Sequence, residues 1–452
     1  MRREGARTMS TDTSVSRNAS QEEEHRAEDR RKVLQARLRR SPARLLWLLA
    51  GPGLLVMLGE NDAPSMLSYA ATGSQFGMGF FLPFVVFTFI MALIAQEITV
   101  RLGAASQTGH ADLIYRRFGR FWGNFAMLDL LLTNFLTLVT EFVGIVAGAG
   151  YFGVPPWAAV MGGVAIVGTA VIVRRYWAWE RFFLFLALGN LIFVPVAIMT
   201  RPDWGFVAHA LWSWQPLIGG FNGNMIVLLL ADIGATITPW MLFFQQGAVS
   251  DKGLSVRDIR HGRVDTAVGA ALAALAALSC IIATAPLFVH HMNARQFGTA
   301  QFAQALVPYI GRVGGALFAL GVLEAGLVAA TVISTSSAYA FGEVTQIAHS
   351  LNHGVREAKG FYAMLVGIAA VAGCLVLLPG FPLEMVVIIV NVIAVLTMPP
   401  AIGFLLILAN DHEIMGPYRS TWWLNALGLA VGIFVTLAGV IYAVSVIVPQ
   451  WF

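Results

Sequence analysis

A polar interruption lies inside the first long apolar segment of this 452-residue chain. Glu60, Asn61, Asp62 and Ser65 stand there with the helix-breaking Pro64, between apolar residues on both sides. Ionisable groups are costly at membrane depth, and irregular backbone is tolerated there only where it lines a cavity or is buried in protein. The sequence therefore predicts an ion-binding site within this segment.

A second interruption, at residues 234–242, occupies the equivalent place in a later apolar segment. The two interruptions share a Pro-x-Met-Leu pattern, which begins at Pro64 in the first and at Pro239 in the second. A proline removes a backbone donor and leaves carbonyls one turn earlier without an N–H partner, so these carbonyls can bind a cation. Paired broken helices in two repeats predict a substrate site at the bilayer midplane.

The side chains at both interruptions are rich in oxygen. Carboxylate, amide, hydroxyl and carbonyl oxygens suit hard divalent ions such as Mg2+ or Mn2+. Met66 and Met241 are the soft ligands nearby, although methionine often only fills core space, and the spacing does not settle which of them turns inward. The expected ligands are Asp62, Asn61, Ser65, Thr238, the carbonyl of Ala235 and Met241.

Three further acids in apolar segments have open roles. Glu60 is either a second ligand or the partner of a buried basic or polar group, and Asp232, one turn before the second interruption, is equally open. Glu141, in the third apolar segment, serves either proton transfer or structural pairing. All three are accessory candidates for the ion site.

The composition is that of a polytopic membrane protein. Hydrophobic residues make up 57% of the chain, charged residues make up 12%, and the mean hydropathy is +0.71. The net charge of +4 comes from Lys and Arg in short loops, which membrane topology explains better than nucleic-acid binding. No P-loop is present, so we expect no direct coupling to ATP. We expect neither an enzyme nor a cofactor beyond the transported ion.

The histidines do not suggest a zinc site. His110, His290 and His291 lack helical metal-ligand spacing and a nearby cysteine, and we expect them to be solvated in loops.

The segment lengths predict an all-α integral membrane protein with eleven transmembrane helices, because a bilayer core of about 30 Å needs about 20 residues per helix. Spans 1–5 and 6–10 would form an inverted repeat of five plus five helices, with helices 1 and 6 broken. We expect a mostly disordered cytoplasmic tail at 1–43 and a transporter domain at 44–447, made of repeat one (44–200), repeat two (222–409) and an additional helix (422–447). The expected spans are 45–72, 78–100, 122–149, 156–174, 182–200, 223–247, 264–289, 314–346, 361–379, 384–409 and 422–447.

The basic loops predict the orientation. Most loop Lys and Arg fall on the side of the N terminus, whereas alternate loops hold only Arg201, Arg295 and Arg312. The positive-inside rule then places the N terminus in the cytoplasm and the C terminus outside.

Several motifs give the chain a family resemblance over nearly all of residues 45–447. The sequence resembles the NRAMP family of divalent-metal transporters, which implies the inverted-repeat fold of bacterial amino-acid symporters, the LeuT-type fold. The motifs that show this resemblance are Gly51-Pro52-Gly53, Gly73-Ser74-Gln75-Phe76-Gly77, Arg101-Leu102-Gly103, Glu141-Phe142-Val143-Gly144 and Gly234-Ala235-Thr236.

The departures from the family pattern narrow the range of ions that we expect the protein to bind. The first break keeps Asp62 but has Ser65 where the family usually has Asn, and the second has Thr238 where the family has Met. A hard oxygen in place of a soft sulfur lowers discrimination against Mg2+. These changes resemble the NRAMP-related magnesium transporter branch. Asn391 occupies the place of a family Gln that can face the ion, and is a further expected ligand.

The resemblance also bears on proton coupling. Trp240 stands where the family has His, Leu138 stands where it has Asp, and the expected Arg pair near the ninth span is reduced to Lys359. Three positions that transfer protons in the family therefore lack the usual residue here, and we expect transport without proton cotransport. An inward-negative membrane potential would itself drive the cation inward.

The sequence thus predicts an importer of Mg2+ and Mn2+ that works by alternating access. The alternatives are a proton-coupled Mn2+ or Fe2+ transporter, a sodium-coupled organic-solute symporter of the same fold, and a non-transporting metal sensor. The expected partners are divalent ions and the lipid bilayer, without nucleic acid. We expect a monomer in the plasma membrane, as in a bacterial inner membrane.

Overall fold

The computed structural model describes residues 31, 32, 35, 38, 39, 48–173, 175–216, 223–292, 294, 297–380 and 383–447. Within these residues the chain forms helices and connecting loops, with no strand. The expected all-α class is therefore confirmed. Most of the predicted tail at 1–43 lies outside the described residues.

The helices follow one another with short connections. In chain order they are α3 (Pro52–Gly59), α4 (Ala63–Phe76), α5 (Phe81–Ser106), α6 (His110–Phe118), α7 (Arg120–Tyr151), α8 (Pro156–Val173), α9 (Tyr176–Ala187), η1 (Leu188–Ile192), α10 (Phe193–Met199), α11 (Trp204–Ser213), α12 (Gly223–Gly234), α13 (Pro239–Lys252), η2 (Val256–Asp258), α14 (Ile259–Val289), α15 (Thr299–Thr345), α16 (Lys359–Val376), α17 (Leu383–Asn410), α18 (His412–Met415), η3 (Gly416–Tyr418) and α19 (Trp422–Ile447).

The described part of the chain forms eleven spans when each broken helix is counted once. In the described part of the chain, 10 helical stretches are long and apolar enough to cross a membrane, including α9 to α10 and α12 to α13 as single stretches. The halves α3 and α4, of 8 and 14 residues, are each too short to span alone and together form the eleventh.

Both predicted breaks are confirmed, and proline explains where the chain re-enters a helix. Pro64 lies in the first turn of α4, and Pro239 is the first residue of α13. A proline in the first turn loses no helical hydrogen bond, because the N–H it lacks would have no partner there. The residues between the half-helices thus leave polar backbone in the middle of the bundle.

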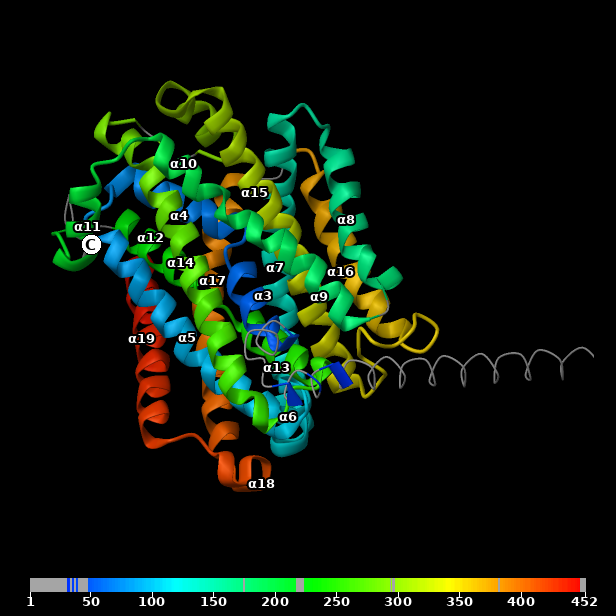
Figure 1. Cartoon of the computed structure of the whole chain (residues 1–452). Helices are drawn as coiled ribbons and strands as arrows, with labels where there is room; N and C mark the ends of the chain where they lie inside the picture. The colour runs from blue at the N-terminus through cyan, green and yellow to red at the C-terminus, as the bar shows by residue number, and fades with distance from the viewer. Residues whose placement is uncertain are drawn as a thin grey trace, which may run out of the picture.

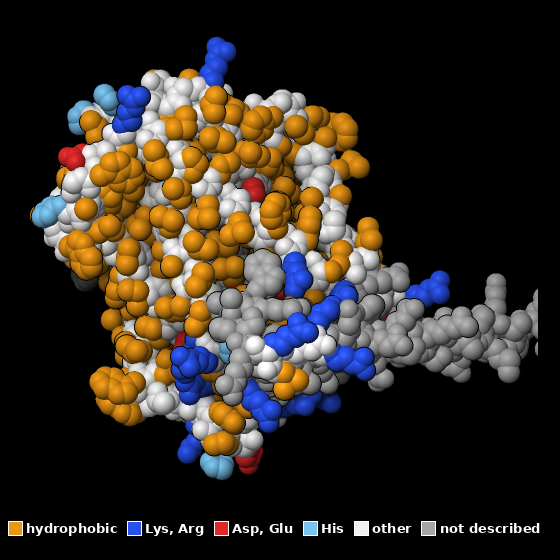
Figure 2. Space-filling model, in the orientation of Figure 1, with side chains coloured by type: hydrophobic (Ala, Val, Ile, Leu, Met, Phe, Trp, Pro, Cys, Tyr) orange, Lys and Arg blue, Asp and Glu red, His pale blue; other side chains and the backbone are white. Residues whose placement is uncertain are grey.

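The broken helices lie at the centre of the bundle. Figure 1 shows α3 and α4 surrounded by long helices, with α8 and α16 on one side and α19 on the other. The longest packed pair is α7 against α15, while α14 packs along both α3 and α4. Apolar side chains are spread widely over the described part of the face in Figure 2, as expected for a protein within lipid.

One predicted span begins at a different residue, and a helical segment not predicted precedes another. The eighth span, expected at 314–346, matches the part of α15 after its kink at Gly311, where φ is 70°, and the segment that begins at Thr299 lies before this kink. The fifth was expected at 182–200, but it begins at Tyr176 and changes to the 3-10 segment η1. Gly189 in η1 lies against the side chain of Glu324, whose Cδ would be 2.9 Å from an added Cβ.

Candidate metal site at the two broken helices

Asp62 forms the start of α4. It is the N-cap residue, and its Oδ1 accepts a hydrogen bond from the Ser65 backbone N–H at 2.8 Å. This bond satisfies one of the donors that a helix start leaves free, and the helix dipole favours a negative charge there. The carboxylate is fixed at the break and is buried, with the residue 1% exposed.

Glu60 and Thr238 join the two breaks directly. The Thr238 hydroxyl donates to Glu60 Oε2 at 2.8 Å, and both residues are buried. The second oxygen of Glu60, Oε1, is buried without a hydrogen-bond partner. The structure therefore gives Glu60 a polar partner and leaves one oxygen available to a cation.

Glu141 brings a third carboxylate to the first break. Its Oε2 accepts from the Ala63 backbone N–H at 3.1 Å, and its Oε1 is buried without a partner. Helix α7 can approach this closely because of Gly144, where an added Cβ would lie 2.2 Å from the Cβ of Ala63. Glu141 thus caps a free donor of α4 beside Asp62.

The Asn61 side chain turns toward α14. Its Nδ2 donates to the Ala273 carbonyl at 2.8 Å, while its Oδ1 is buried without a partner. Asn190 of η1 approaches the same break from another side, since its Nδ2 donates to the Leu58 carbonyl at 3.4 Å. The side-chain amides of Asn61 and Asn190 thus hydrogen-bond the residues around the first break to the rest of the bundle.

The second break carries its own polar network. The Ala235 carbonyl, expected as a ligand, accepts from the Tyr69 hydroxyl at 2.9 Å, and Asn391 Nδ2 donates to Ser68 Oγ at 3.0 Å. Gly234 packs so closely that an added Cβ would lie 2.0 Å from the Asn391 carbonyl oxygen. Both expected ligands therefore lie at the contact between α4 and the second break.

Residues of α4 that the sequence interpretation passed over complete this network. Thr72 Oγ1 donates to Asp232 Oδ2 at 2.9 Å, and Asp232 Oδ1 is buried without a partner. Ser68, Tyr69 and Thr72 stand at helical spacing after Ser65, and this polar stripe in an apolar segment was the signal that could have identified them.

Two methionines and a tryptophan next to the breaks are buried. Met66 and Met241 are both 0% exposed. Trp240 is also fully buried, its carbonyl accepts from Ser336 Oγ at 3.1 Å, and its ring lies 6.1 Å from that of Phe244.

The possible ligand atoms at the two breaks are mainly oxygens, and few of them belong to charged side chains. Among the described residues, no three or more His, Cys, Asp and Glu side chains are grouped to hold a metal ion. A cation here would be held by carboxylate, hydroxyl, amide and carbonyl oxygens. Oxygen ligands of this kind suit hard divalent cations.

The start of α3 is anchored by buried charges. Asp265 of α14 accepts from the backbone N–H groups of Gly51 at 3.0 Å and Gly53 at 2.8 Å. Lys252, at the end of α13, donates to the Ala50 carbonyl and pairs with Glu180, with both distances 2.6 Å. These bonds tie the first half-helix to α9, α13 and α14.

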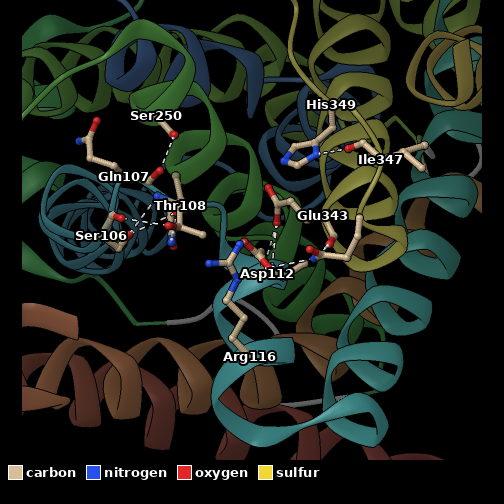
Figure 3. Close-up of polar contacts among 12 residues, drawn as sticks. Ser106, Gln107, Thr108, Asp112, Arg116, Ser250, Glu343, Ile347 and His349 are labelled. Carbon is tan, nitrogen blue, oxygen red and sulfur yellow. Dashed lines mark hydrogen bonds and ion pairs between the residues drawn. The ribbon is translucent and has the colours of Figure 1, made fainter. Parts of the chain in front are cut away.

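A second polar network holds α6. Glu343 Oε2 accepts from the backbone N–H groups of Ala111 at 2.9 Å and Asp112 at 3.2 Å, and Asp112 in turn pairs with Arg116 (Figure 3). Because the first backbone N–H groups of α6 donate to a carboxylate of α15, the α5–α6 connection is held at the end of that long helix.

His110 corrects one expectation. It was expected to be solvated in a loop, but it is the first residue of α6, is fully buried, and bonds through Nδ1 to Gln246 Oε1 at 2.8 Å. Burial lowers its pKa to about 4. His290 and His291 are exposed, as expected.

The fold and the paired broken helices define a membrane transporter of the inverted-repeat class. The structure is similar to that of the Eremococcus coleocola manganese transporter, with a TM-score of 0.73 and 20% identity, covering 89% of this chain and 87% of that one. It is also similar to MhsT in complex with L-phenylalanine, with a TM-score of 0.52 and 14% identity over 87% of this chain and 98% of that one. The expected fold is confirmed.

The sequence comparison gives the family. The profile of the natural resistance-associated macrophage protein-like (Nramp) family matches residues 53–445, and the chain belongs to this family. The divalent metal cation transporter MntH of Brucella suis is 26% identical over 398 residues, 83% of each chain. That of Ralstonia nicotianae is 28% identical over 295 residues, 61% of this chain and 64% of that one.

Proposed function

We propose that this protein transports divalent metal cations and that its substrate is Mg2+, with Mn2+ also carried. The family and the names of the related MntH proteins support the divalent cation. The proposed ligands are Asp62, Ser65, Asn61, Thr238, the Ala235 carbonyl, Met241 and Asn391, with Glu60, Glu141 and Asp232 as accessory acids.

The observation that supports Mg2+ as the substrate is the position of the Thr238 hydroxyl at the second break. It lies 2.8 Å from Glu60, and therefore next to the first break. A hydroxyl here adds a hard oxygen to a site whose charge comes from carboxylates, and hard oxygen ligands favour Mg2+ over softer transition metals. The short side chains of Ser65 and Thr238 would leave space for metal-bound water.

The way the half-helices are held supports a mechanism of alternating access. The candidate site is closed in this structure, since the side chains that would form it are at most 3% exposed. The start of α3 is fixed by Asp265 and Lys252, so release of these bonds would free α3 to move away from the bundle. The ion would then leave on that side.

By the positive-inside rule, the end of the bundle at the start of α3 would face the cytoplasm. Lys and Arg gather near the lower end of the face in Figure 2, below a broad apolar surface. The protein would then lie in the plasma membrane with its N terminus inside and its C terminus outside. It would act as a monomer, because each chain contains both broken helices.

We propose transport without proton cotransport. Trp240 and Leu138 are both buried and cannot carry a proton, although they occupy family positions associated with proton transfer. The membrane potential is sufficient to drive a divalent ion inward, at about 2.3 kcal/mol per charge per 100 mV.

Isothermal titration of the purified protein tests the substrate class. We expect Mg2+ and Mn2+ to bind competitively and L-phenylalanine to give no heat. Binding of Mn2+ that excess Mg2+ cannot displace would favour the rival function, a proton-coupled Mn2+ or Fe2+ transporter using the sulfur of Met66 or Met241. Binding of L-phenylalanine alone would instead indicate an organic-solute symporter.

A further inference from the structure

A groove at the outer surface of the bundle lies away from the two breaks. It has a volume of about 390 Å3 and is formed by α5, α14 and α19. This volume is within the range of ordinary small-molecule sites. Its walls are apolar, formed by Leu93, Ala267, Leu424 and Leu427.

One end of the groove is basic. Arg101 and Arg263 both lie in its wall, and both contact Oε1 of the single acid there, Glu97, at 3.2 Å and 2.5 Å. The two arginines and one glutamate give this end one net positive charge. Arg263 remains 45% exposed at its side chain, so it can make further bonds.

Two buried polar atoms at this end have no partner in the structure. They are Nε of Arg101, which is a donor, and Oε2 of Glu97, which is an acceptor. These atoms lie beneath the groove surface and are not open to a ligand in it. The net positive charge of this end, carried outward by the half-exposed Arg263, therefore points to a ligand with an anionic oxygen.

Exposed apolar side chains flank the groove. Val264 and Val268 of α14 are 41% and 47% exposed, and Leu427 of α19 is 46% exposed. At the basic end, Trp423 stacks on Trp422 with 3.8 Å between ring centroids, and both rings are more than half exposed. Exposed tryptophans beside arginines are typical of the membrane–water interface.

We propose that this groove binds an anionic phospholipid. The acyl chains would lie along the apolar wall, and the phosphate would accept from Arg101 and Arg263. A headgroup hydroxyl, as in phosphatidylglycerol, would donate to Glu97. Basic pockets between transmembrane helices are established sites for anionic headgroups.

The groove is connected to the first broken helix. Thr266 lies in its wall, accepts from Gln245 of α13 at 3.0 Å, and packs on Gly53, where an added Cβ would lie 2.3 Å from Thr266 Oγ1. The neighbouring Asp265 binds the start of α3. A bound lipid would therefore fix the turn of α14 that holds α3, and would change the transport rate; this last step rests on the proposed function.

Native mass spectrometry of the full chain, with equimolar phosphatidylglycerol, phosphatidylethanolamine and phosphatidylcholine in the detergent, tests the binding. We expect preferential retention of phosphatidylglycerol. Arg263→Gln should lower that retention about fivefold, because one arginine near an anionic headgroup contributes a factor of this size. The matched control, Arg312→Gln, removes an exposed arginine outside the groove and should retain the lipid as the parent protein does.

A steric variant separates the groove from diffuse attraction. Leu427→Trp keeps the charges and fills the apolar wall, so it should also lower retention, with a melting temperature showing that the variant is folded. Equal retention of all three lipids, or unchanged phosphatidylglycerol retention in both Arg263→Gln and Leu427→Trp, would overturn the proposal. Because this readout needs no transport, its failure is distinguishable from failure of the proposed function.

Discussion

The hydroxyl of Thr238 donates a hydrogen bond to Glu60 at 2.8 Å, and this bond joins the two broken helices of the bundle. The two residues are 178 positions apart in sequence and lie in different repeats. Glu60 keeps its other oxygen, Oε1, buried and without a partner. The contact is therefore the point where a change of one side chain should alter both the geometry and the chemistry of the candidate site.

Substitution of Thr238→Met should change ion preference. A thioether would replace a hard oxygen and would release Glu60, so the ratio of Mn2+ to Mg2+ affinity should rise about tenfold. Competition titrations of the purified variant measure this ratio. Thr238→Ser is the matched control, because it keeps the hydroxyl, and its ratio should stay near that of the parent protein. An unchanged ratio in Thr238→Met would show that this side chain does not face the ion.

Substitution of Asp62→Asn should lower divalent-ion affinity by about tenfold or more, since it removes a full negative charge from a buried site. The amide oxygen can still accept from the Ser65 N–H, so the start of α4 should survive. Titration with Mg2+ and a melting curve without metal separate these effects. Asp129→Asn is the control, because Asp129 is an acid of α7 that is no part of the site. Full Mg2+ affinity in Asp62→Asn would exclude Asp62 as a ligand.

Removal of one partner from the buried Lys252–Glu180 pair should destabilise the protein. Lys252→Met leaves Glu180 buried and uncompensated, which costs about 3 kcal/mol or more, whereas Lys252→Met with Glu180→Gln should recover much of this loss. The Tyr176 hydroxyl can still donate to the neutral amide oxygen, as it does to Glu180 at 2.8 Å. Melting temperatures of the single and double variants test this, and an equal loss in both would contradict a charge-based explanation.

The buried His110 predicts loss of stability in acid. Its pKa is lowered to about 4 by burial, against about 6.5 in an unfolded chain, so below pH 6.5 the unfolded state binds more protons. Stability is therefore complete above pH 6.5 and falls as the pH drops toward 4, by about 2 kcal/mol between pH 6.5 and 5. Melting temperatures at pH 7.5 and 5.0 measure this. His110→Gln should show a smaller acid loss than the parent protein, and an identical loss would assign it to other groups.

Much of the fold could be predicted from the sequence because its signals are strong. Apolar segments of span length predict membrane helices, and Pro64 and Pro239 beside polar residues predict both breaks. The helical segment of α15 before Gly311 was not predicted, because it is too short to span a membrane alone and contains Pro308 and polar residues. The 3-10 segment η1 was also missed, because its residues Leu188–Ile192 are as apolar as the α-helices on either side.

The candidate site was predicted less completely. Asp62 and Thr238 were apparent as polar residues at breaks, but the partners of each group depend on packing between helices. The Glu60–Thr238 bond, the Glu141 bond to Ala63 and the Tyr69 bond to Ala235 all join residues that no local spacing relates. His110 was misplaced for the same reason, since its partner Gln246 lies on α13.

Ion uptake into liposomes that contain the purified protein and a pH-sensitive dye tests the central claim most directly. With an inward-negative potential, we predict that Mg2+ enters, that Mn2+ competes with it, and that the lumenal pH stays constant. Liposomes with the Asp62→Asn variant provide the background rate. Failure of Mg2+ to enter while Mn2+ does so would contradict the magnesium assignment, and lumenal acidification that follows metal entry would contradict transport without protons.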